Sequence, residues 1–147
     1  MAKSPEMQRF QFIAADVSKT NYVERVVADA TGLKNERALE FVWCLAGVST
    51  PMLWTNDNAL EAAQHNMDVN YSRSAKMSRA IMRARLLPGH GKQQQSSTPT
   101  RRPIPKHIAF TGSVLSTFSL AGHGTYCPSK LALRALADTL AMEARLA

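Results

Sequence analysis

The chain has 147 residues, of which 45% are apolar and 20% charged, and its formal net charge is +7. This length and apolar content suit a single globular domain, because most domains hold about 100 residues or more. No apolar run reaches the roughly 20 residues that a membrane-spanning helix needs, and the two cysteines and four histidines lack metal-ligand spacing, so neither feature is predicted within these residues.

The first predicted element is a buried strand at residues 9–15, which is rich in apolar side chains and ends beside Asp16. A helix is expected at residues 22–30, because apolar residues recur there at intervals of three and four. Gly32 follows that pattern directly and is a suitable end for the helix. The chain therefore opens with a strand followed by a helix.

A second strand is expected at residues 39–45, where the apolar run is nearly continuous, as in strands that are covered on both faces. It leads into Ala46 and Gly47, where small residues let a ligand approach the backbone. Residues 58–87 have helical character, with Asn70 in the middle of the segment.

A polar segment of low complexity follows at residues 88–105, and we expect an exposed, poorly ordered insertion there. A third strand is predicted at residues 107–111, then a loop, and then a helix at residues 128–145 with a leucine-rich buried stripe. Strands that alternate with helices predict an α/β domain with a parallel sheet of three strands.

The positive charge gathers in two places, Lys76, Arg79, Arg83 and Arg85 in the long helix and Arg101, Arg102 and Lys106 in the polar segment. These clusters suit a solvated helix face and a basic loop, or attraction to a phosphate or an anionic membrane surface. No aromatic residues interleave with the arginines, so a nucleic-acid partner is not predicted.

Tyr126 and Lys130 are the clearest candidates for catalytic residues in the sequence. Two residues four apart project from the same face of a helix, so the ammonium group can stabilise a phenolate. A tyrosine hydroxyl ordinarily has a pKa of about 10, and a neighbouring cation favours its release of the proton. The pair therefore suits a proton donor to a carbonyl, although a packing aromatic and a surface charge would give the same residues.

The set Asn70, Ser113, Tyr126 and Lys130 resembles the catalytic tetrad of the short-chain dehydrogenase/reductase family. Ser113 stands 13 residues before Tyr126, and Lys130 stands four after it, as in that family. The resemblance implies a partial Rossmann-like, doubly wound fold and the roles of the four residues. Tyr126 is the expected acid, Ser113 orients the carbonyl, and Asn70 holds a water that links Lys130 to solvent. Ser113 and Asn70 also suit plain structural roles in a loop and a helix kink.

The same resemblance implies a nicotinamide cofactor, NADPH rather than NAD. Asp16 and Val17 match the place where the family contacts the adenine ring, and Ala46 and Gly47 match the end of its Asn-Asn-Ala-Gly motif. Both asparagines of that motif are replaced, by Cys44 and Leu45. Asp16 also suits a plain loop carboxylate. Further cofactor contacts are implied for the pair Tyr126 and Lys130.

Within the family, residues 126–143 are similar to the corresponding helix of the fungal 3-ketodihydrosphingosine reductases, as are residues 42–47. This similarity implies NADPH-dependent reduction of 3-ketosphinganine to sphinganine at the cytosolic face of the endoplasmic reticulum, with a cytoplasmic location as the alternative. Reduction of another carbonyl compound and a non-catalytic remnant are the alternative functions. A homo-oligomer formed through the helices at residues 71–87 and 128–147 is also implied.

The family's Gly-rich turn, Thr-Gly-x-x-x-Gly-x-Gly, does not occur in the sequence. In the family this turn admits the pyrophosphate to a helix N-terminus. The resemblance therefore predicts that the 147 residues are an incomplete cofactor-binding domain, an interior part of a longer enzyme. We expect the 147 residues alone to bind NADPH poorly and to turn over little.

Overall fold

The computed structural model describes residues 12–17, 19, 22–32, 41–86 and 107–145. In chain order the elements are α1 (Tyr22–Gly32), β1 (Phe41–Cys44), α2 (Ala59–Met67), α3 (Arg73–Leu86), β2 (His107–Phe110) and α4 (Cys127–Glu143). A π-helical turn, Asp68–Ser72, joins α2 to α3 without a break, and a 3-10 turn, Val114–Ser116, follows β2.

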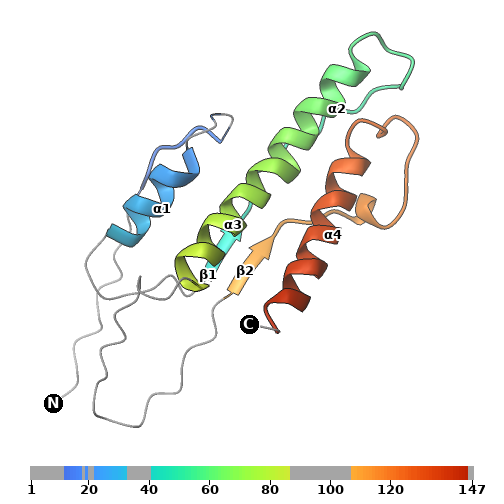
Figure 1. Cartoon of the computed structure of the whole chain (residues 1–147). Coiled ribbons are helices and arrows are strands. Elements are labelled where there is room, and N and C mark those ends of the chain that lie inside the picture. The colour runs from blue at the N-terminus through green and yellow to red at the C-terminus, as the bar shows by residue number, and fades with distance from the viewer. Residues whose placement is uncertain (1–11, 18, 20–21, 33–40, 87–106, 146–147) are drawn as a thin grey trace, which may run out of the picture.

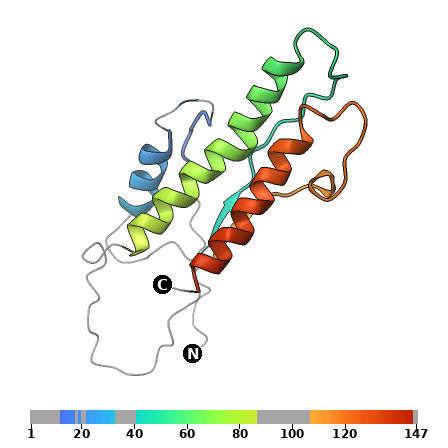
Figure 2. The same cartoon turned by 45° about the vertical axis from the view of Figure 1, so that its right-hand side comes forward.

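The two strands form a parallel sheet, in which Phe41 pairs with His107 and Cys44 with Phe110. Parallel strands need a long crossover connection. Here the crossover contains α2, the π-helical turn and α3. In both views α3 lies between α1 and α4, and the three helices cover one face of the sheet (Figure 1, Figure 2). The α/β class and the parallel sheet are therefore confirmed.

The most deeply buried side chains of the described residues are polar. Those with less than 2% exposure are Asn66, Asn70, Ser78, Thr125 and Ser129. Buried polar groups are tolerated only where they find hydrogen-bond partners, since an unpaired one costs about 1–3 kcal/mol. The interior between α2, α3 and α4 is therefore held by directed hydrogen bonds as well as by apolar packing.

The structure corrects the prediction of a strand at residues 9–15. Residues 12–15 are described and form no strand, and Phe12 is 93% exposed, while residues 9–11 lie outside the described part. An apolar run becomes a strand only where a neighbour exchanges backbone hydrogen bonds with it, and β1 pairs with β2 alone among the described residues. The described sheet therefore has two strands where three were predicted.

The other predicted elements fall close to their expected places. The helix predicted at residues 22–30 is α1, and the helix predicted at residues 58–87 is α2 and α3 with the π-helical turn between them. The segment predicted as an insertion, residues 88–105, lies outside the described residues. None of the helices in the described part is both long and apolar enough to span a membrane.

The face of the sheet opposite the helices is bare in the described part of the chain. Phe41 and Trp43 alternate with Val42 and Cys44 along β1, and both aromatic side chains are 59% exposed. A strand of this composition is typical of a sheet that is covered on both faces. The described residues cover only one of the two.

Candidate active site

The predicted site residues gather at the carboxyl ends of β1 and β2. Gly47 follows β1, and Ser113 follows β2, and because the strands are parallel their carboxyl ends lie at the same edge of the sheet. The pairing continues past the strands, since the amide of Thr111 donates to the Cys44 carbonyl over 3.1 Å. Open α/β sheets bind their ligands at this edge.

Lys130 lies one turn into α4 and is only 4% exposed. Its Nζ donates to the Thr111 carbonyl over 2.9 Å, which uses one of its three hydrogens. Neither of the two ion pairs found among the described residues, Arg25 with Asp29 and Arg134 with Asp138, involves it. Burial lowers the pKa of Lys130, since desolvation penalises the charged form.

Tyr126 stands at the position directly before α4, and Pro128 in the first turn suits the start of that helix. Its ring is half-buried, and the Lys130 Nζ lies 5.9 Å from the ring centroid. The structure therefore brings the tyrosine and the lysine to one side of the helix start.

Asn70 lies in the π-helical turn with none of its surface exposed. Its Nδ2 donates to the Val48 carbonyl and to Ser129 Oγ, each over 2.9 Å, and its Oδ1 accepts from the Val48 amide over 2.8 Å. Both amide hydrogens are thus used within the protein. The predicted water beside Asn70 would have to bind through an oxygen of this residue.

Ser113 starts the 3-10 turn, and its Oγ accepts a hydrogen bond from the Leu115 amide over 3.2 Å. A hydroxyl group accepts and donates, so this contact leaves the hydroxyl hydrogen to point toward a ligand. The turn packs against α4, the helix that carries Lys130. All four residues of the predicted tetrad therefore lie around one junction of β1, β2, the π-helical turn and α4.

Gly47 faces this junction. A Cβ atom at this position would lie 3.1 Å from Asn70 Oδ1 and 3.3 Å from Lys130 Nζ, closer than ordinary contacts. The missing side chain keeps open the space beside the ammonium group, which fits a cofactor that approaches Lys130 and Tyr126 there. The residues present thus suit the nicotinamide end of such a cofactor, whereas the sequence has no Gly-rich turn for its pyrophosphate.

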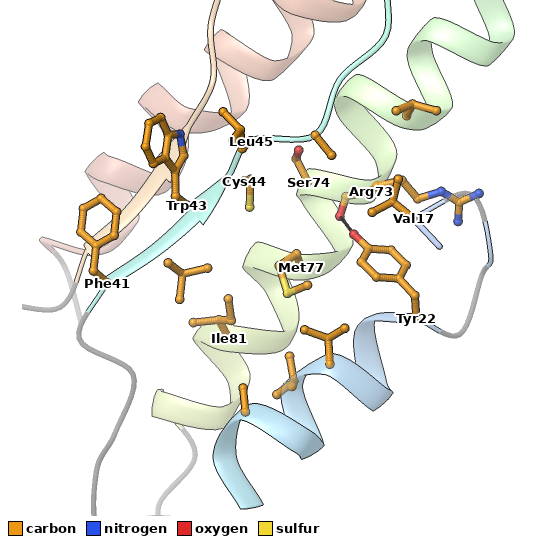
Figure 3. Close-up of a pocket in the computed structure, with 16 residues that line it drawn as sticks. Val17, Tyr22, Phe41, Trp43, Cys44, Leu45, Arg73, Ser74, Met77 and Ile81 are labelled. Atoms are coloured by element: carbon orange, nitrogen blue, oxygen red, sulfur yellow. Dashed lines mark hydrogen bonds between the residues drawn. The ribbon is translucent and has the colours of Figure 1, made fainter. Parts of the chain in front are cut away.

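Val17 and Ala46 line a separate cavity of about 440 Å³ between α1, β1 and α3 (Figure 3). Its wall is mostly apolar, and the Tyr22 hydroxyl at its rim donates to the Arg73 carbonyl over 3.2 Å. Asp16 is exposed, and its carbonyl accepts a hydrogen bond from the Lys19 amide. The structure therefore brings Val17 and Ala46 together, but Asp16 does not line this cavity.

Four further polar residues at the junction were not predicted from the sequence. Together with Val48 and Asn70 they form a hydrogen-bonded cluster that we call the polar junction, which consists of Val48, Thr50, Asn66, Asn70, Thr125 and Ser129. One signal was available, since Asn66 stands four residues before Asn70 and so shares its helix face.

Within the described residues, no group of three or more histidine, cysteine, aspartate and glutamate side chains could hold a metal ion. Burial raises the pKa of the Cys44 thiol, so the reactive thiolate is disfavoured there. The groups that the structure brings together at the site are hydroxyl, amide and ammonium groups.

No family model matches the chain. Solved structures do resemble it, at 22–23% sequence identity. LigO from Sphingobium has a TM-score of 0.70, with 89% of this chain and 42% of that chain covered. The closed form of serine dehydrogenase complexed with NADP+ has a TM-score of 0.64, with 88% and 45% covered. A Burkholderia phymatum short-chain dehydrogenase/reductase in complex with NAD has a TM-score of 0.59, with 87% and 40% covered.

The chain therefore shares the fold of the solved short-chain dehydrogenases/reductases. Among curated proteins it is similar to the 3-ketodihydrosphingosine reductases of fungi. It is 51% identical over 142 residues to the Neurospora crassa protein and 34% identical over 143 residues to the Aspergillus fumigatus protein. Each match covers 97% of this chain, and the chain spans 37% of the length of both relatives.

Proposed function

We propose that the protein reduces the ketone of 3-ketodihydrosphingosine, also called 3-ketosphinganine, to the alcohol sphinganine with NADPH as the reductant. The observation that carries this proposal is the buried ammonium of Lys130 beside Tyr126, with no ion pair to a carboxylate among the described residues. A buried, unpaired charge destabilises a fold, so such a group is typical of a reaction site. The names of the fungal relatives support the substrate.

Each side chain has a role in the reaction that its contacts allow. The Ser113 hydroxyl donates a hydrogen bond to the ketone oxygen and holds it beside the tyrosine. Tyr126 transfers its hydroxyl proton to that oxygen, and the nearby Lys130 ammonium stabilises the phenolate that remains. Asn70 fixes the π-helical turn against Val48 and Ser129. When bound, the reduced nicotinamide supplies the hydride that the carbonyl carbon receives.

The cofactor would lie along the carboxyl edge of the sheet. Gly47 leaves room beside Lys130, so the nicotinamide end fits there, with Tyr126 and Lys130 as hydrogen-bond donors to it. Ala46 and Val17 lie toward α1, where we place the adenine end with Asp16 beside it. Solved relatives of this fold are complexed with NADP+ or NAD, which supports a nicotinamide cofactor, and NADPH is our choice between them.

The helices offer surfaces for the proposed location and assembly. Lys76, Arg79 and Arg83 are exposed at helical spacing on α3, which supports association with an anionic membrane surface such as the cytosolic face of the endoplasmic reticulum. Leu131 and Met142 of α4 are 56% and 59% exposed on one face. Two such helices can bury these side chains against each other, which supports the proposed homo-oligomer through residues 71–87 and 128–147.

The test uses the protein expressed at its natural length from its gene. We expect NADPH oxidation with 3-ketosphinganine, with a higher kcat/KM than with a panel of small ketones. The variant Tyr126→Phe, which keeps the ring and removes the proton, serves as the inactive control. A preference for a small ketone would refute the sphingoid substrate, and no turnover of any ketone by the folded protein would refute the reductase.

A further inference from the structure

A second buried asparagine lies one helical turn from Asn70. Asn66 has none of its surface exposed, and its Nδ2 donates to the Thr125 carbonyl over 3.0 Å. Its Oδ1 accepts from the Thr50 hydroxyl over 3.4 Å. Thr125 is only 1% exposed, and its own hydroxyl donates to the Thr50 carbonyl over 2.6 Å. Asn66 thus ties the segment after β1 to the residue that directly precedes Tyr126.

The spacing of the two asparagines suits contacts with two residues that stand two apart in the segment after β1. Residues four apart on a helix are separated by about 6 Å along its axis, and residues two apart in an extended chain by about 6.6 Å. Asn70 contacts Val48, and Asn66 contacts Thr50, two residues further on. The two contacts therefore join α2 and the π-helical turn to the segment that follows β1 at two neighbouring points.

The same two asparagines hold the carbonyl groups on either side of Tyr126. Asn66 donates directly to the Thr125 carbonyl. Asn70 donates to Ser129 Oγ, which donates over 2.7 Å to the carbonyl of Tyr126 itself. The peptide groups around the tyrosine are therefore fixed at two points by one helix face.

The loop before Tyr126 has backbone contacts of its own, since the Tyr126 amide donates to the His123 carbonyl over 3.0 Å. Gly122 has a positive φ of 78°, and Phe118 and Leu120 are more than half exposed. A backbone hydrogen bond of 2.8 Å joins the Met52 amide to the Gly122 carbonyl earlier in the loop. The N–H of the peptide that joins Thr125 to Tyr126 is thus held by His123, and the carbonyl of the same peptide is held by Asn66.

We infer that Asn66 is a positioning residue for proton transfer from Tyr126, acting through the Thr125 carbonyl. The inference rests on the proposed reductase function. Without the Asn66 amide, the buried Thr125 carbonyl lacks its donor and the peptide turns to find another one. The phenol then moves relative to Lys130 and the ketone, and proton transfer is sensitive to displacements of about 1 Å.

The main experiment compares Asn66→Leu with Asn58→Leu in the protein expressed at its natural length. Asn58 is exposed and makes no side-chain cap bond at the start of α2, so it is a matched control. We expect Asn66→Leu to lower kcat by about 10- to 100-fold and to shift its pH profile, with KM for NADPH changed less than about two-fold. A crystal structure of this variant should show the Tyr126 hydroxyl displaced from its wild-type position.

Unchanged kcat and pH profile in a folded Asn66→Leu protein, or an equal loss in Asn58→Leu, would overturn the inference. Should Asn66→Leu fail to fold, Thr50→Val takes its place, because it deletes only the hydroxyl that orients the Asn66 amide. We expect Thr50→Val to lower kcat about three-fold with a shifted pH profile, and wild-type values would overturn the inference. A wild-type protein that reduces no ketone would instead overturn the proposed function, and the positioning role of Asn66 with it.

Discussion

The polar junction and the apolar cavity beside α1 differ in how they are filled. Within the polar junction, Asn66, Asn70, Thr125 and Ser129 are almost completely buried and hydrogen-bonded to one another or to the backbone. The cavity between α1, β1 and α3 keeps about 440 Å³ open and is lined mostly by apolar side chains. Precise chemistry and apolar stabilisation therefore lie in different parts of the molecule. Substitutions in the two regions should separate activity from stability.

The largest effect is expected for Tyr126→Phe. Loss of the proton donor should lower kcat by about 1,000-fold, within the range for general acids. The free energy of unfolding should change by less than about 0.5 kcal/mol, because the ring stays and the phenol hydroxyl makes no hydrogen bond to another described residue. Steady-state NADPH oxidation and denaturant unfolding measure both quantities. A variant with more than a tenth of wild-type kcat would remove Tyr126 from the role of acid.

Lys130→Met should lower the activity and raise the stability of the protein. We expect kcat to fall by about 100-fold and the free energy of unfolding at neutral pH to rise, because a buried charge without an ion pair is removed.

The difference in stability between Lys130→Met and wild type should depend on pH. Burial lowers the pKa of Lys130 from its ordinary value of 10.5, so the folded protein loses this proton at a lower pH than the unfolded chain. Between the folded-state pKa and 10.5 the unfolded state binds more protons, so wild-type stability rises with pH relative to Lys130→Met. The advantage of the variant is therefore fully present below that window and lost as the pH approaches 10.5. A constant advantage at all pH values would contradict the assignment to a buried charge.

Ile81→Ala tests the apolar region. Ile81 is 3% exposed on α3 and lines the cavity, so its truncation should lower the free energy of unfolding by about 2 kcal/mol. The value lies at the low end for such changes because an adjoining cavity already leaves room for relaxation. We expect kcat at saturating NADPH to stay within about two-fold of wild type, since Ile81 lines the cavity and is not part of the polar junction. A large loss of kcat would show that the two regions are coupled.

Gly47→Ala should give the smallest effect, and it should change both the stability of the protein and the KM for NADPH. The added Cβ would press on Asn70 Oδ1 and Lys130 Nζ, which are held by the Val48 amide and the Thr111 carbonyl. We expect a loss of about 1 kcal/mol in stability and about a ten-fold rise in KM for NADPH. Gly112→Ala, where an added Cβ would meet no atom within 4 Å, is the matched control, and an equal rise in KM there would argue against the close approach at Gly47.

The sequence was sufficient to predict that Tyr126 lies near Lys130 and that Gly47 and Ser113 lie at one edge of the sheet, because helical spacing and parallel strands fix these positions. The catalytic roles of these residues stay predictions. The sequence was not sufficient for residues 9–15, because apolar composition does not reveal whether a partner strand is present. Residues 12–15 have none in the described part, and Phe12 is exposed.

The polar junction was missed for a different reason. The sequence does not tell a buried asparagine in a helix from a solvated one. Asn66 is buried because Thr50 and Thr125, which are far away in sequence, form hydrogen bonds with it. The π-helical turn around Asn70 likewise follows from tertiary contacts, since the predicted helix at residues 58–87 gave no sign of it.

Thr111 connects the bare face of the sheet to the lysine. Its Oγ1 accepts a hydrogen bond of 3.0 Å from the indole of Trp43, while its carbonyl accepts from Lys130 Nζ. The half-exposed indole is thus two hydrogen bonds away from the ammonium group. The fluorescence of Trp43 should therefore change when a ligand forms a hydrogen bond with Lys130. Cofactor binding could then be followed by the intrinsic fluorescence of the protein. In a Trp54→Phe background, Trp43 is the one tryptophan of these 147 residues that emits, and the signal can be read directly.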